Sequence, residues 1–161
     1  MVVNILFPEH DILANAIIEQ IADDLYDMSD KEILSKDYMI IFTTLTVVDP
    51  DELNRQIEHF KFIIENNEHE IILLAPKGLE LDGALKINLP DIDKFMEVIE
   101  KDRRLLPAFD FIEYDTVKAI ENLNVDDAIK ITLFTLAMKY FLFKLEELSN
   151  EIKRKLNYET Q

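Results

Sequence analysis

The stretch Tyr38-Met39-Ile40-Ile41-Phe42-Thr43-Thr44-Leu45-Thr46 decides the fold of this chain. It is rich in β-branched and aromatic residues, which is typical of a strand in the middle of a sheet. Asp49-Pro50-Asp51-Glu52 follows it, and this acidic cap with proline and further acids predicts the start of a helix. A buried strand that leads directly into a helix indicates an α/β fold.

The same alternation continues on both sides of this stretch. Strands are predicted at 2–7, 70–75 and 84–89, because each is a short apolar run next to residues that break strands. Apolar residues at three- and four-residue spacing predict helices at about 12–26 and after Asp49, and Pro90-Asp91 opens another. Residues 27–37 fit either a poor edge strand or a short helix. We therefore expect a mostly parallel sheet of four or five strands, of flavodoxin-like or receiver-like type.

The composition changes after residue 102. The sequence predicts no strand there, but a helix at 114–123 and a second helix that is capped by Asp126 and runs to about Leu156. We expect an α/β domain at 1–102 and a C-terminal helical extension, a hairpin, at 103–161.

The last helix has two different halves. Its first half is apolar nearly all round, so it is expected to be buried on several sides. Its second half narrows to one seam, which consists of Phe141, Leu145, Leu148, Ile152 and Leu156. Such a seam predicts a partner helix. The partner is either the 114–123 helix of the same chain or a second copy in a homodimer.

The net charge narrows the range of partners. The 161 residues include 33 acidic and 17 basic side chains, which gives a net charge of −16. This charge repels nucleic-acid phosphates and anionic lipids, so we expect no direct contact with nucleic acid or membrane. No leader pattern is present, and lysines interrupt the apolar stretch 129–145, so we expect a cytoplasmic protein.

The composition also excludes several kinds of chemistry. There are no cysteines, which excludes disulfides, thiolate zinc sites and cysteine nucleophiles. Only two glycines occur, so a glycine-rich phosphate loop is excluded. His10, His59 and His69 have no spacing that suits a metal site. We expect no cofactor, no metal and no catalytic set.

Four segments of residues 1–102 follow the order of one known family. Residues 4–11 are a strand that ends in acids and a histidine, and 37–42 are a strand that ends in Phe42. Residues 71–75 are a strand that ends in Leu-Ala, and 89–95 are a proline turn that leads into a helix. On these segments the chain resembles a response-regulator receiver domain. The resemblance implies a signalling protein with a doubly wound α/β fold.

The residues that carry receiver chemistry are replaced in this chain. Glu9 and His10 stand at the metal-binding acids, Phe42 at the phospho-acceptor aspartate, Leu74 at the switch Thr/Ser and Leu89 at the lysine. Phosphoryl transfer to a receiver needs a carboxylate nucleophile with Mg²⁺ beside it, and phenylalanine and leucine cannot supply that. The resemblance therefore implies a pseudo-receiver that contacts other proteins without phosphotransfer.

Polar residues follow the predicted parallel strands, where ligands gather in open α/β sheets. They are Glu9, His10, Asp11, Thr43, Thr44 and Lys77. This set predicts a small-ligand site in which His10 would act as a base. In the alternative interpretation, Asp11 caps the following helix and His10 is an exposed loop residue.

Three functions remain open. The first is a non-enzymatic regulatory module that works by protein–protein contact, with the last helix binding a partner or a second copy. The second is an acidic inhibitor that mimics nucleic acid, because acids cluster at Asp23, Asp24, Asp27 and Asp30. The third is a small-ligand sensor or enzyme that uses the strand-end residues.

Overall fold

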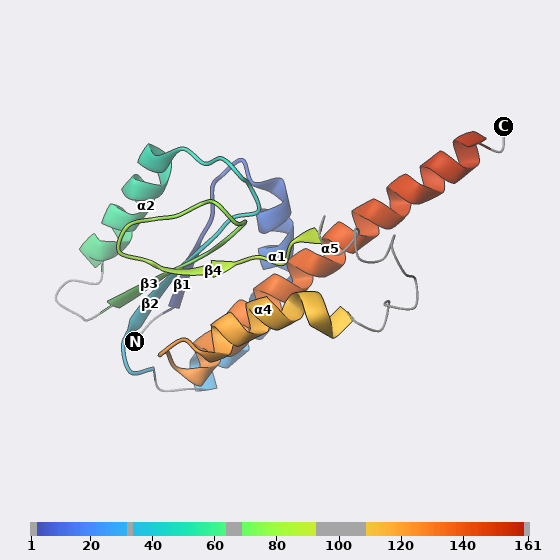
Figure 1. Ribbon diagram of the computed structural model, residues 1–161. Coiled ribbons are helices and arrows are strands. Elements are labelled where there is room, and N and C mark those ends of the chain that lie inside the picture. Colours follow the sequence, from blue (N-terminus) through green and yellow to red (C-terminus); the bar gives the residue numbers. More distant parts are fainter. Residues whose placement is uncertain (1–2, 32–33, 64–68, 93–108, 160–161) are drawn as a thin grey trace.

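The computed structural model describes residues 3–31, 34–63, 69–92 and 109–159 (Figure 1). Its strands and helices alternate through the first half of the chain, as the sequence predicts. In chain order they are β1 (Val3–Leu6), α1 (Ile12–Lys31), β2 (Asp37–Phe42), α2 (Pro50–Ile63), β3 (His69–Ala75), β4 (Leu85–Asn88), α4 (Phe109–Glu121) and α5 (Asp127–Glu159).

The four strands form one parallel sheet in the order β1-β2-β3-β4. Every residue of β2 is buried, which confirms it as the central strand. Just beyond the end of β2, the Thr43 hydroxyl and the Thr44 backbone N–H donate to the side chain of Asp11. The sheet is all parallel and four-stranded, but its order differs from the 2-1-3-4-5 order of flavodoxin-like sheets.

The two faces of the sheet carry different helices. Tyr38, Ile40 and Phe42 of β2 point into an apolar cluster with residues of α1 and α5. Met39 and Ile41 point into a second cluster, with Leu53 and Ile57 of α2 and other residues. Figure 1 shows α2 on one side of the sheet and α1, α4 and α5 on the other.

This arrangement has an unusual consequence for the connections. The steps from β1 to β2 and from β2 to β3 move in the same direction across the sheet, yet α1 and α2 lie on opposite faces. Two such crossovers have opposite hands, so one of them is left-handed, against the strong right-handed preference. Helix α1 lies on the face where α5 packs.

The segment at 27–37 does not form an edge strand in the residues that the structure describes. Helix α1 continues to Lys31, and Leu34 is buried in the cluster that α1 and α5 share. Ser35 and Lys36 form a bend before β2. The helix that the sequence predicts after Pro90-Asp91 lies, beyond Ile92, outside the described residues.

The predicted C-terminal hairpin is present. Helix α4 packs on α5, which has 33 residues and is about 50 Å long. The N-terminal half of α5, which we call its proximal half, contributes Ile129, Leu133 and Leu136 to the cluster beneath the sheet. The distal half extends beyond the sheet and α4 (Figure 1).

The first half of α5 is buried on several sides, as expected, but one side is open. Ile131 is 50% exposed, Phe134 41% and Leu142 47%. These large apolar side chains lie on the side of α5 that turns away from the sheet cluster. Apolar composition all round the helix therefore did not mean burial all round, because its neighbours leave this one side uncovered.

Candidate functional site

Asp11 is a fully buried carboxylate at the carboxyl end of the sheet. Its Oδ1 accepts hydrogen bonds from Ala14 N at 3.1 Å and Thr44 Oγ1 at 2.6 Å. Its Oδ2 accepts from Thr43 Oγ1 at 2.8 Å and Thr44 N at 2.7 Å. The prediction that Asp11 caps α1 is confirmed. Through these four hydrogen bonds the carboxylate joins the start of α1 to the segment that follows β2. Each of its two oxygens already accepts two hydrogen bonds.

Glu9 and His10 lie apart from this network. The backbone N–H of Glu9 donates to Glu52 Oε1 at 3.1 Å, and His10 Nδ1 is 3.8 Å from Glu52 Oε2. Both contacts lead to α2, and the His10 side chain is 59% exposed. The structure thus brings Asp11, Thr43 and Thr44 together and places His10 as an exposed loop residue on the side of α2.

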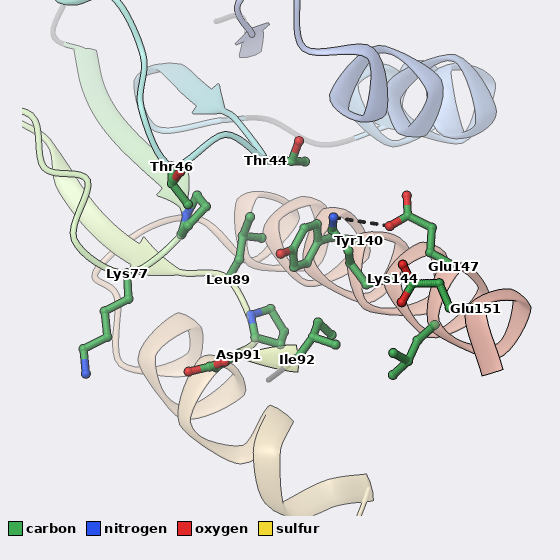
Figure 2. A pocket seen from close by; sticks show the side chains of 13 residues that line it. Thr44, Thr46, Lys77, Leu89, Asp91, Ile92, Tyr140, Lys144, Glu147 and Glu151 are labelled. Atoms are coloured by element: carbon green, nitrogen blue, oxygen red, sulfur yellow. Dashed lines mark hydrogen bonds and ion pairs between the residues drawn. The ribbon is translucent and has the colours of Figure 1, made fainter. Parts of the chain in front are cut away.

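A cavity of about 460 Å³ lies between the ends of the strands and α5 (Figure 2). Two of the predicted site residues, Thr44 and Lys77, line it. The position fits the rule that ligands of open α/β sheets bind beyond the carboxyl ends of the strands. The full lining consists of Thr44, Thr46, Pro76, Lys77, Leu89, Pro90, Asp91, Ile92, Tyr140, Lys144, Glu147, Leu148 and Glu151.

The charges of the cavity are mixed. Lys77 and Lys144 contribute positive charge, and three carboxylates oppose it, those of Asp91, Glu147 and Glu151. Lys144 Nζ lies 3.4 Å from Glu147 Oε2, so part of this charge is neutralised within the lining (Figure 2). Within the described residues, no group of three or more His, Cys, Asp and Glu side chains is placed to hold a metal ion.

Sequence reasoning missed the role of Lys86. Its Nζ donates to the carbonyl oxygens of Ala75 at 3.2 Å, Pro76 at 2.9 Å and Leu79 at 2.5 Å. Burial lowers the pKa of this lysine, and the nearby carboxylate of Glu80 opposes that effect in part. Lys86 therefore fixes the loop that carries Lys77 to the cavity. A lysine inside a predicted apolar strand is the signal that could have pointed to it.

A polar cluster joins β2 to the start of α5 at the other end of the sheet. Asp126 Oδ2 accepts from Tyr38 Oη at 2.7 Å and from Ser35 Oγ at 2.8 Å, and Tyr38 Oη accepts from Asp126 N at 3.1 Å. Burial raises the pKa of Asp126, but the hydrogen bonds from Tyr38 and Ser35 and the charge of Lys36 outweigh it and leave the pKa below its usual value. Burial raises the pKa of Tyr38 above its usual value, although the backbone N–H of Asp126 opposes this.

Replacing Tyr38 with phenylalanine is expected to lower the free energy of unfolding by about 2 kcal/mol near neutral pH, because a hydrogen bond to a charged group is lost. The Asp126 contribution is present above the ordinary aspartate pKa and is lost as the pH falls through the lowered pKa of the folded state. The Tyr38 contribution is present below the ordinary tyrosine pKa and is lost as the pH rises through the raised one. The denaturant midpoints of the original protein and of the Tyr38→Phe variant should therefore differ most between about pH 4 and pH 10. A difference that stays constant into strong acid would contradict this role of Asp126.

The residues of the predicted seam on α5 have different surroundings. Phe141 is completely buried, so it belongs to the interior and not to a contact face. Leu145 and Leu148 are half-buried. Ile152 and Leu156 belong to α5, and their side chains lie outside what the structure describes.

Leu145 and four positions before it define what we call the α5 stripe. Ile131, Phe134 and Leu142 are exposed, and Met138 and Leu145 are half-buried. At 3.6 residues per turn, all five fall within an arc of about 80° on one side of the helix. The sequence could not show this stripe, because exposure depends on where α1, α4 and the sheet lie.

Comparisons with protein-family models, with curated proteins and with solved structures find no match for this chain. In the part of the chain that the structure describes, no helix combines the length and the apolar character that a bilayer span requires.

Proposed function

We propose that this protein is a non-enzymatic regulatory module that acts by contact with another protein through the α5 stripe. The observation that carries the proposal is the exposure of Ile131, Phe134 and Leu142 along one side of one helix. Single exposed apolar residues are ordinary, but several large ones on one side of one helix favour a contact surface. The distal half of α5 extends past the sheet and α4 (Figure 1).

The proposal includes a receiver-like origin for the sheet domain. The order 2-1-3-4-5 becomes the observed order of four strands when its outer strand is left out. The fully buried Phe42 occupies the position of the phospho-acceptor and packs among apolar residues. Both observations support a pseudo-receiver that keeps the architecture for contact rather than for phosphotransfer.

Replacing Leu142 with glutamate is expected to abolish capture of the partner in a pull-down from the native host, because a charge would have to be buried in the contact. Leu142 is 47% exposed, so the folded state should tolerate the change. Asn150→Glu is the matched control, because it adds the same charge at an exposed position of α5 outside the stripe. Equal capture by both variants would overturn the proposal.

The same experiment separates the other two functions when it is done at low and at high salt. An apolar contact should survive high salt. A basic nucleic-acid-binding protein that is lost at high salt would favour the acidic inhibitor instead. If nothing binds at either salt, the cavity that Lys77 lines becomes the leading candidate, as the site of a small-ligand sensor.

A further inference from the structure

We infer that the α5 stripe binds a second copy of this chain, with the two α5 helices packed antiparallel. The inference rests on the proposed function and names its partner. The stripe is one-sided and begins near the start of α5, while the distal half of the same helix extends beyond the rest of the chain (Figure 1). Each copy thus offers an exposed receiving surface on the proximal half and a projecting helix on the distal half.

The spacing of the apolar residues suits an antiparallel pair. Met138, Leu142 and Leu145 alternate by four and three residues, the repeat of paired helices. A two-fold axis between Leu142 and Leu145 would place each of these leucines against the other leucine of the second copy. Because the two leucines exchange places about the axis, the contact is self-complementary.

The charges beside the stripe favour this orientation. Lys139 and Glu146 are one heptad apart along the same edge of the stripe. In the antiparallel register, each Lys139 faces Glu146 of the second copy, which gives two symmetric ion pairs. In a parallel pair, Lys139 would instead lie next to Phe134 of the second copy, which offers no charge.

The net charge of −16 opposes association of two copies, but the charge is unevenly distributed along the chain. Residues 152–161 contain three basic residues and one acidic residue, so they carry a net charge of +2. The other 151 residues carry a net charge of −18, so that the whole chain has −16. Antiparallel pairing places the basic end of each α5 against the acidic body of the other copy, where the charges attract.

Sedimentation analysis of the full chain across the micromolar range tests the partner. We expect a concentration-dependent dimer of twice 18.9 kDa. Leu142→Glu should weaken the dimer roughly a hundredfold, since the change is repeated on both helices. Ser149→Leu, at an exposed position that faces Met138 of the second copy, should strengthen it roughly tenfold, which a folding defect could not imitate.

Charge reversal tests the register. Glu146→Lys and Lys139→Glu should each weaken the dimer roughly tenfold, and the double variant should restore it. Glu58→Lys on α2 is the matched control, because it changes the net charge equally at an exposed position far from the stripe. If both single variants dimerise weakly and the double variant does not regain the original dimer affinity, the antiparallel register is overturned.

Spin labels test the orientation directly, because the chain has no cysteine and one engineered cysteine is the sole attachment point. Labels at position 131 should lie roughly 35–40 Å apart in the antiparallel dimer, against roughly 10 Å in a parallel one. Labels at position 142 should be close in both arrangements and serve as the control.

The outcomes distinguish the inference from the proposed function. A chain that stays monomeric, while Leu142→Glu still abolishes capture of a different host protein, overturns the second copy and leaves the proposed contact function. A dimer that is insensitive to Leu142→Glu also overturns the second copy at the stripe, because the stripe would then lie outside the dimer interface; the proposed function is overturned only if Leu142→Glu also leaves capture of the partner unchanged.

Discussion

Replacing Asp11 with alanine should lower the free energy of unfolding by about 4 kcal/mol. The substitution removes the acceptor of four hydrogen bonds. It costs about 1 kcal/mol for the lost cap of α1 and leaves the hydroxyl of Thr43, a fully buried residue, without its acceptor, which costs a further 1–3 kcal/mol or so. The segment after β2 also loses its attachment at Thr44. For a chain of this size the melting temperature should fall by roughly 10 °C.

Asp11→Asn is the control for this prediction. It keeps one acceptor oxygen and the size of the side chain, so it should lose about half as much stability. Thermal and denaturant unfolding, followed by circular dichroism, ranks the stabilities of the original protein, Asp11→Asn and Asp11→Ala. If Asp11→Ala cost less than about 1 kcal/mol, the four hydrogen bonds would not anchor the end of the sheet.

Introducing aspartate at Phe42 should prevent folding altogether. Phe42 is fully buried at the end of the central strand, among apolar residues of α1 and α5. A carboxylate there would lose the packing of an aromatic ring, worth about 3–5 kcal/mol, and would also have to be buried without a partner. The sum exceeds about 5 kcal/mol, which is a large part of the stability of a typical domain.

This substitution also tests the proposed receiver-like origin, since it would introduce the residue type that the resemblance implies for a phospho-acceptor at that position. Phe42→Leu is the control and should cost only about 1 kcal/mol, because the site stays apolar. Dispersion of amide resonances in NMR spectra reports folding of both variants. A folded Phe42→Asp protein would mean that position 42 tolerates the acceptor, so that packing of the core would not explain why a phenylalanine stands there.

The elements of the sheet domain could be predicted from the sequence because their signals are local. The apolar run of β3 and the Asp49-Pro50 start of α2 need no knowledge of the rest of the chain. The extension of α1 to Lys31 could not be predicted, because the polar residues after position 26 carry no clear periodicity. The strand order and the face that each helix covers depend on packing between distant segments.

The candidate site was predictable only in part, for the same reason. The rule that parallel strands end at one edge brought Asp11 close to Thr43 and Thr44 correctly. It could not show that Glu9 and His10 instead contact the carboxylate of Glu52 on α2, away from the Asp11 network. Nor could it show that residues of α5, such as Tyr140 and Lys144, complete the cavity, because α5 lies more than 50 residues beyond β4 at that point.

The sharing of one apolar cluster between the sheet and α5 sets the order in which the chain can complete its core during synthesis. The cluster on the α2 side needs only residues up to about the start of β4, so it can form early. The opposite cluster waits for Leu133, Leu136 and Tyr140 of α5. Until those residues leave the ribosome, only α1 can cover Ile40, Phe42 and Leu74 on that face, and a nascent chain with such incompletely covered apolar surface is prone to aggregate.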